Sequence, residues 1–232
     1  MRLVAVVLAL AACLGCEAAA TNPPAARTIE QITPPAGFTR IPLEDGTFGD
    51  WLRGLELEPV GTPVRMWDGR ESLNQRWHER VVRLSLLSRW QECADSVLRL
   101  RAEWATQHGT FQFHGSNLWY GMSRAAFEQS LRGLFVRTGT HNLEQELARP
   151  ADLQVGDVLV FGGSPGHAVL VMDEARDHAG RRVVLIGNGF MPARSFYLVR
   201  TGGSPWHRVE DLDVGMRVEP GYQFTWKHVR RF

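Results

Sequence analysis

The segment Gly156-Asp157-Val158-Leu159-Val160-Phe161 is followed by the loop Gly162-Gly163-Ser164-Pro165-Gly166 and by the run His167-Ala168-Val169-Leu170-Val171-Met172. Two short apolar runs rich in β-branched residues, separated by a loop rich in Gly, predict two strands joined by a tight connection. We expect strands at residues 157–161 and 168–172. Similar runs at 183–186 and 196–199 extend this pattern into an antiparallel meander.

The preceding part of the chain has helical periodicity. Between residues 89 and 107, apolar side chains recur at the spacing of one buried helix face: Trp90, Cys93, Ala94, Val97, Leu98, Leu100 and Trp104. Ser88 with Gln91 three residues later resembles a capping box, and Gly109 is a stop signal. A second helix is expected at 125–136. Helices followed by strands indicate an α+β domain.

Three residues form a candidate catalytic set. His167 stands at the mouth of a strand after a glycine loop, a rigid position suited to a general base. Cys93 lies near the start of the first helix, where the helix dipole stabilises a thiolate, although a cap at Ser88 would put it in the second turn. Asn188, at the end of a later strand, is placed to orient the imidazole. The order Cys, His, Asn is papain-like.

Other motifs point to substrate binding or to no chemistry. Trp119 and Tyr120 follow the first helix in a loop and are candidates to line a groove for a glycan or peptide. Ser164 is expected to shape the loop beside His167. The loop fits the pattern Gly-x-Ser-x-Gly, but a nucleophile elbow needs a helix after it, and a strand is predicted there. The eight histidines have no zinc-ligand spacing, so neither a metal nor a cofactor is predicted.

The N-terminal residues have the layout of a secretory signal. Residues 1–12 carry one positive charge, at Arg2, before a short apolar run that is too short for a permanent transmembrane helix. The run ends in Leu-Ala-Ala before Cys13, the pattern at which lipoprotein signals are cut, with Cys16 as an alternative. We expect a lipidated anchor and flexible spacer over 13–37, then one domain over 38–232, at the periplasmic or outer-membrane face of the cell envelope.

Composition narrows the class of protein further. The formal net charge is +1 and acidic and basic residues are mixed, so no nucleic-acid partner is expected. The hydrophobic fraction of 44% is that of a globular chain. With Cys13 in the anchor and Cys16 in the spacer, Cys93 is the lone thiol of the folded part. Exported proteins normally use cysteine for disulfides, so this thiol is either inertly buried or kept for chemistry.

The chain also resembles known families. The sequence motifs Gly-Asp-Val-Leu-Val-Phe and Gly-His-Ala-Val-Leu-Val look like the histidine region of NlpC-type and CHAP cell-wall peptidases. Over nearly the whole domain the chain resembles a bacterial lipoprotein family catalogued as domain of unknown function 4846. The matching words are Leu52-Arg53-Gly54-Leu55, Gly61-Thr62-Pro63-Val64, Asp68-Gly69-Arg70, Asn74-Gln75, His78, Cys93-Ala94-Asp95, Arg99-Leu100-Arg101-Ala102-Glu103, 156–173, Met191-Pro192-Ala193, Ser204-Pro205-Trp206 and Arg231-Phe232.

The resemblance implies a papain-like fold, with a helix packed on an antiparallel sheet, and the candidate residues Cys93 and His167. The chain departs from the family at Arg89, where an aspartate is usual, and at Asn188, where a glutamine is usual. The resulting hypothesis is an envelope cysteine hydrolase that cleaves an amide bond, with peptidoglycan peptides as the obvious partner. The alternatives are a non-catalytic envelope protein that binds glycan, peptide or protein, and an acyl transferase using the same three residues.

Overall fold

The computed structural model describes residues 27–219 and 221–232. The predicted signal peptide and the candidate lipidation sites Cys13 and Cys16 lie outside the described residues. Within them, no helix is long and apolar enough to cross a bilayer.

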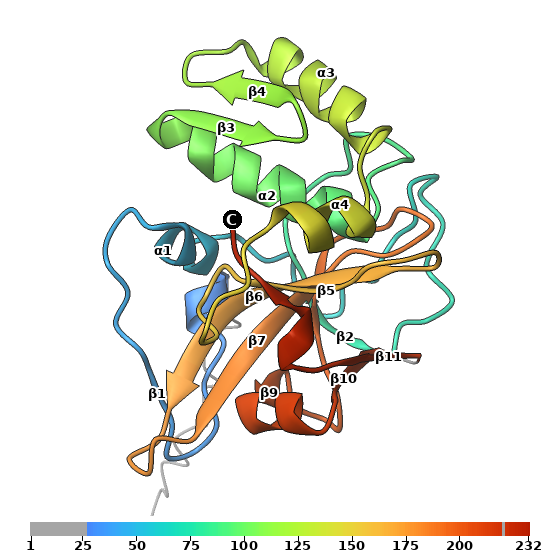
Figure 1. Ribbon diagram of the computed structural model, residues 1–232. Coiled ribbons are helices and arrows are strands. Elements are labelled where there is room, and N and C mark those ends of the chain that lie inside the picture. Colours follow the sequence, from blue (N-terminus) through green and yellow to red (C-terminus); the bar gives the residue numbers. More distant parts are fainter. Residues whose placement is uncertain (1–26, 220) are drawn as a thin grey trace, which may run out of the picture.

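An antiparallel sheet of eight strands forms the centre of the molecule (Figure 1). Six strands follow the order β12-β5-β6-β7-β8-β2, while β1 pairs with β6 and β9 pairs with β7. The strands are β1 (Thr39–Arg40), β2 (His78–Val81), β5 (Val158–Phe161), β6 (His167–Arg176), β7 (Arg182–Asn188), β8 (Tyr197–Val199), β9 (Trp206–Arg208) and β12 (Val229–Arg230). The run β5-β6-β7-β8 is the predicted meander.

The helices lie on one face of this sheet, and a small hairpin with a short 3-10 helix lies on the other (Figure 1). The helices are α1 (Phe48–Arg53), α2 (Cys93–His108), α3 (Arg124–Phe135) and α4 (Thr140–Glu146), with η1 (Ile29–Gln31), η2 (Val209–Asp213) and η3 (Trp226–His228) as 3-10 turns. Two hairpins complete the fold, β3 (Thr110–Phe113) with β4 (Ser116–Trp119) and β10 (Met216–Glu219) with β11 (Tyr222–Phe224).

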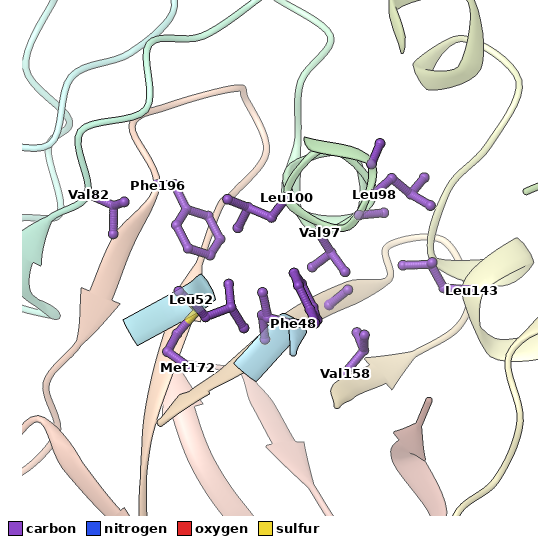
Figure 2. Close-up of a cluster of buried hydrophobic side chains, with 14 of the residues drawn as sticks. Phe48, Leu52, Val82, Val97, Leu98, Leu100, Leu143, Val158, Met172 and Phe196 are labelled. Atoms are coloured by element: carbon purple, nitrogen blue, oxygen red, sulfur yellow. The ribbon is translucent and has the colours of Figure 1, made fainter. Parts of the chain in front are cut away.

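The main core lies between α2 and the sheet (Figure 2). Val97, Leu98 and Leu100 of α2 are fully buried, as are Leu170 and Met172 of β6. Burying a side chain of this size stabilises the fold by roughly 1.5–3 kcal/mol. Because α2 is held along this stripe, the position of its first turn over the sheet is fixed by packing.

A second apolar cluster covers the opposite face of the sheet. Val169 and Val171 of β6 pack there with Leu212 of η2, Met216 of β10 and Phe224 of β11. Alternate residues of β6 therefore enter two different cores, and every residue of the strand except Arg176 is buried. This explains the nearly continuous apolar sequence, because a strand covered on both faces has no polar side to show as alternation.

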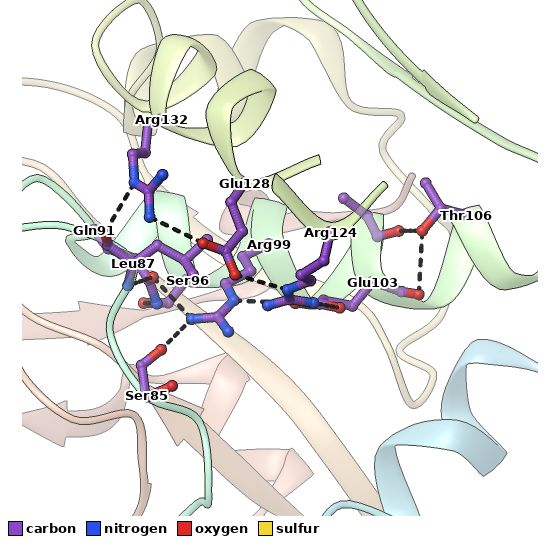
Figure 3. A network of polar contacts seen from close by, with 11 residues as sticks. Ser85, Leu87, Gln91, Ser96, Arg99, Glu103, Thr106, Arg124, Glu128 and Arg132 are labelled. Carbon is purple, nitrogen blue, oxygen red and sulfur yellow. Dashed lines mark hydrogen bonds and ion pairs between the residues drawn. The ribbon is translucent and has the colours of Figure 1, made fainter. Parts of the chain in front are cut away.

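A network of charged residues connects α2 to α3 (Figure 3). The buried Arg99 donates to Gln91 Oε1 at 3.0 Å, to the carbonyl oxygen of Ser85, and to Glu103 at 3.3 Å. Arg124 of α3 donates to both Glu103 oxygens, at 2.9 and 3.0 Å. Each buried charge here has hydrogen-bonding partners, as a stable buried ion pair requires.

The predicted α+β class is confirmed, and two boundaries differ from those expected. The helix expected over residues 89–107 is α2, and it begins at Cys93. Ser88 Oγ accepts from Trp90 N in a local turn and does not cap this helix. The expected spacer ends earlier than residue 37, because Ile29 is fully buried in the main core and its amide donates to Leu55 O. This short apolar contact was not predicted because the surrounding sequence is rich in Ala and Pro and has no apolar periodicity.

Candidate functional site

The first turn of α2 carries the candidate nucleophile. Cys93 is the first helical residue and Glu92 is the N-cap. The backbone N–H of Glu92 donates to Asp95 Oδ2 at 2.9 Å, which caps the turn. Cys93 is therefore closer to the positive end of the helix dipole than a helix capped at Ser88 would place it.

The thiol of Cys93 is buried against the sheet. Only 6% of the residue is exposed. Burial raises the pKa of the thiol to about 11, and this outweighs hydrogen bonds from the backbone of Ala168 and Ala94, which lower it. The expectation of a thiolate stabilised by the helix start is therefore wrong. The hydrogen bond from Ala168 nevertheless puts the sulfur beside the residue that follows His167.

The end of β7 packs on the same helical turn. A Cβ atom at Gly189 would lie 2.8 Å from Ser96 Oγ and 3.2 Å from the carbonyl oxygen of Glu92. Both distances are shorter than ordinary van der Waals contact, so only glycine allows this close approach. Asn188, the preceding residue, is held at this junction between β7 and the start of α2.

His167 is the first residue of β6 and is almost completely buried, with 1% exposed. Its ring lies 4.5 Å from the ring of Tyr222 and 5.1 Å from that of Phe190, measured between centroids. Burial lowers the pKa of His167 to about 4, although hydrogen bonding with the Asn188 side chain raises it. The imidazole is thus neutral at pH 7, which is the form that accepts a proton. Its Nε2 atom has no hydrogen-bond partner of good geometry among the described residues.

Asn188 is fully buried on the same face of the sheet as His167. It pairs with Val169, two residues along β6 from His167. Its Nδ2 donates to the hydroxyl oxygen of Tyr197 at 2.9 Å. This bond holds the amide in place beside the imidazole. The structure thus brings the backbones of Cys93, His167 and Asn188 to one end of the β6–β7 pair, but the side chains of His167 and Asn188 lie on the face of the sheet opposite α2, where the His167 ring contacts Tyr222 and Phe224.

A cavity of about 410 Å³ opens beside Cys93. Its walls come from the start of α2, the start of α4 and the loop before β6. The lining residues are Trp90, Glu92, Cys93, Ala94, Asp95, Phe135, Val136, Thr138, Gly139, Thr140, His141, Gly163, Ser164, Pro165, Gly166 and Met191. Ser164 therefore shares a cavity with Cys93. The strand β6 follows its loop, so the Gly-x-Ser-x-Gly pattern lacks the helix that a nucleophile elbow needs.

Trp119 and Tyr120 lie elsewhere. They line a separate cavity of about 270 Å³ with Glu103, Thr106 and Gln107. Thr106 is 13 residues after Cys93 on α2, so this cavity lies about 20 Å along the helix from the thiol. The two aromatic residues are exposed, but they do not belong to the Cys93 cavity.

Sequence reasoning missed two carboxyl groups at the thiol. Asp95 is 5% exposed, and burial raises the pKa of its carboxyl to about 8. Burial also raises the pKa of Glu92. The signal for Asp95 was its place three residues after a possible N-cap at Glu92, which is the spacing of a capping box. Among the described residues, no group of three or more His, Cys, Asp or Glu side chains forms a metal site.

Comparison with known proteins gives a family and no function. No curated protein and no solved structure matches the chain. A family model described as "Domain of unknown function (4846)" matches residues 29–118 and 112–231, which include Cys93, His167 and Asn188. This match covers most of the chain, which therefore belongs to the family of domain of unknown function 4846.

Proposed function

We propose that this protein is a cell-envelope lipoprotein of papain-like fold that hydrolyses an amide bond, with Cys93 as nucleophile, His167 as general base and Asn188 as the residue that positions His167. One observation carries the proposal. The first residue of the central helix is a cysteine whose sulfur meets the backbone beside His167, with Asn188 next to the imidazole and a cavity at the thiol. These are the roles that a Cys-His-Asn hydrolase requires.

The reaction starts from a neutral pair. The His167 imidazole must turn about the start of β6 to reach the Cys93 thiol. It then accepts the thiol proton as the sulfur attacks the carbonyl carbon, and the carbonyl π electrons move onto its oxygen. The amide N–H of Cys93, at the helix start, is a donor to this oxyanion. Collapse breaks the C–N bond, and the leaving amine takes the proton from the imidazolium. Water then attacks the thioester with His167 again as base, releasing a carboxylic acid and restoring the thiol.

The neutral pair has a consequence for when the thiol becomes reactive. Burial raises the pKa of Cys93 and lowers that of His167, so both shifts oppose a resting thiolate–imidazolium pair. A substrate carbonyl must therefore be present before proton transfer becomes favourable. This arrangement limits reaction of the thiol with other electrophiles in an oxidising compartment.

The location and substrate follow from the N-terminal sequence and from analogy. A lipid on Cys13 would hold the domain at the membrane, with residues 14–26 as spacer. Peptidoglycan stem peptides contain amide bonds in that compartment and are the substrates of the cell-wall peptidases that the histidine region resembles, so these are the substrates to examine first. Neither a metal nor a cofactor has a part in the proposed reaction.

One observation favours a second candidate, a non-catalytic envelope protein that uses the cavity to bind peptide, glycan or protein. Cys93 is buried and its thiol pKa is about 11, as for a structural cysteine. In that case Cys93 fills space at the start of α2, and the cavity binds its ligand without cleaving it.

Digestion of peptidoglycan fragments distinguishes the two. We expect wild type to release new amino and carboxyl ends, detected by liquid chromatography and mass spectrometry. Cys93→Ser and His167→Gln should each reduce the rate by at least about 10³-fold. Asp50→Asn, which removes a carboxylate on α1 instead, is the control and should be fully active. Cleavage by Cys93→Ser at the wild-type rate would disprove the thiol mechanism, and binding of intact fragments without cleavage would favour the second candidate.

The anchor has its own test. Mass spectrometry of the mature N-terminus from bacterial membranes should find a diacylglyceryl group on Cys13 and loss of residues 1–12. A Cys13→Ser variant should stay in the soluble fraction. An intact N-terminus, or acylation at Cys16, would refute the site at Cys13.

A further inference from the structure

Asp95 has an unusual environment for a buried carboxyl group. Its Oδ2 accepts the backbone N–H of Glu92, but its Oδ1 is buried with no hydrogen-bond partner among the described residues. The residue is 5% exposed and is part of the wall of the Cys93 cavity. An unpaired buried carboxylate oxygen is costly, and most such groups in proteins have partners.

The charges near Asp95 increase this cost. The negative charge of Glu92 raises the pKa of Asp95 further, and Glu92 is also a lining residue of the cavity. Neither acid forms a salt bridge within the described part of the chain, and no lysine or arginine is among the cavity residues. The other titratable residues lining it are Cys93 and His141. The cavity thus has two acidic groups and no built-in cation.

The remainder of the cavity wall is mixed, with apolar residues beside the polar Thr138, Thr140, His141 and Ser164. Phe135 is buried, while Trp90, Val136 and Met191 are exposed at its rim, with 52%, 72% and 51% of their surface accessible. Exposed apolar residues around a concave site are typical of ligand contact surfaces. The site combines acidic groups at the start of α2 with apolar residues of the wall.

We propose that this cavity is a binding site for a primary ammonium group carried on a short apolar stem, with the carboxyl groups of Asp95 and Glu92 as its anionic partners and Trp90, Phe135 and Val136 contacting the stem. Asp95 Oδ1 is covered in the structure, so a rotation of the Asp95 side chain toward the cavity accompanies binding. The ammonium supplies what the site lacks, namely a positive charge and N–H donors for Oδ1. A neutral alcohol offers a donor without the charge. A carboxylate would be repelled by both acids.

The site does not depend on the proposed hydrolase. If Cys93 is a nucleophile, the ammonium belongs to the substrate, as a free amino group close to the amide that is cleaved. If the protein only binds, the same amine is part of its ligand. A binding measurement with small probes therefore tests the site whether or not any amide is hydrolysed.

Isothermal titration calorimetry with three matched probes tests the proposal. n-Pentylamine should bind the wild-type protein at pH 7.5 with a Kd of about 1 mM, and n-pentanol and n-pentanoate should bind at least about tenfold more weakly. Asp95→Asn should reduce pentylamine affinity at least about tenfold, because the amide keeps the cap of Glu92 but loses the charge. Equal affinities for the amine and the alcohol in wild type would overturn the proposal.

Asp50→Asn is the matched control. Asp50 is the third residue of α1, and its Oδ2 accepts the N–H of Gly46 as Asp95 accepts that of Glu92. This variant removes the same charge from the same helical position, outside the cavity, and pentylamine binding should be unchanged. Similar losses in the two variants would show a general charge effect and would overturn the site. If Asp95→Asn does not fold, the wild-type affinities for pentylamine and pentanol test the proposal alone: tighter binding of the amine supports it, and equal affinities overturn it.

Proton release gives a readout that a purely structural Asp95 would not affect. Because the pKa of Asp95 is about 8, the bound ammonium must displace a proton from it at pH 7. Titrations at pH 7 in buffers of different ionisation enthalpy should show release of close to one proton, and affinity should rise about fivefold between pH 7 and 8. Binding without proton release would contradict the contact with Asp95.

Discussion

The first turn and the middle of α2 accommodate buried polar groups in opposite ways. In the middle, Arg99 is 3% exposed and bonds to Gln91, Ser85 and Glu103, and Arg124 pairs with Glu103 (Figure 3). At the first turn, Cys93 and Asp95 are similarly buried, but neither forms an ion pair with any residue that the structure describes, and burial raises the pKa of both. The difference shows that the chain can satisfy a buried charge in this helix. Leaving Asp95 without a cation is therefore a local property of the cavity.

The largest contrast is expected in the reactivity of the thiol. With a pKa of about 11, Cys93 should react with iodoacetamide about tenfold faster for each pH unit between 7 and 10, since the thiolate is the nucleophile. Peptide mapping by mass spectrometry separates Cys93 from Cys13 and Cys16. In urea, where an ordinary cysteine pKa of about 8.5 applies, labelling at pH 7 should be at least about 100-fold faster. Rapid labelling of the native protein at pH 6 to 7 would contradict the buried thiol.

The network of Arg99 should contribute most to stability. Arg99→Ala leaves Gln91 Oε1 and the carbonyl of Ser85 without this donor and should lower the free energy of unfolding by about 3–5 kcal/mol. Urea unfolding followed by circular dichroism measures the change. A loss below about 1 kcal/mol would mean that the middle of α2 gains no more from its partners than the first turn does.

Asp95 should make stability fall as pH rises. Its folded pKa of about 8 is above the unfolded value of about 3.9, so the folded state holds the extra proton and the loss occurs between these values. His167 and His207, with folded pKa values of about 4, act in the opposite sense but only below their unfolded value of about 6.5. Between pH 6.5 and 8, wild type should lose up to about 1.4 kcal/mol per pH unit.

Urea unfolding across this pH range checks the effect of Asp95. The slope should be much reduced in Asp95→Asn and retained in Asp50→Asn. Parallel curves for wild type and Asp95→Asn would mean that Asp95 is ionised in the folded protein.

The smallest effect is expected at the exposed edge of the network. Arg132 donates to Glu128 at 3.0 Å and to the carbonyl oxygen of Leu87 at 3.0 Å, but 47% of its side chain is exposed. Water screens such a pair, so Arg132→Ala should change stability by at most about 1 kcal/mol. A loss comparable to that of Arg99→Ala would show that the network acts as one unit instead of depending on its buried member.

The sequence predicted the elements whose signal is local. Apolar runs located β5 to β8, and apolar periodicity located α2 and α3. Short elements stabilised by tertiary contacts were not predicted, among them α1 and α4. The start of α2 was misplaced because two residues could begin a capping box: Ser88 with Gln91, and Glu92 with Asp95. Only packing of the turn against β7 selects Glu92 as the N-cap.

The candidate residues were found by type and order, but their electrostatics were not. The sequence favours a thiolate at the start of a helix, yet burial at the sheet dominates the pKa of Cys93. The burial of the Cys93 thiol depends on contacts with Ala168 and with other residues of the cavity wall, which are distant from Cys93 in the chain. Trp119 and Tyr120 were placed at the site because they follow the helix in sequence, although α2 is long enough to separate them from Cys93.

The glycines of the loop before β6 allow this wall of the cavity to pack directly on α4. A Cβ at Gly166 would overlap Thr140 Oγ1 of α4, and one at Gly162 would overlap the carboxylate of Glu144. The loop and α4 are thus in direct contact, and the two walls cannot move closer together. Glu144 also accepts the N–H of Gly162 at 3.3 Å, which opposes their separation. Two walls of the cavity are thus held together as one unit, and the entropy cost of ordering them is met when the chain folds and not when a ligand binds.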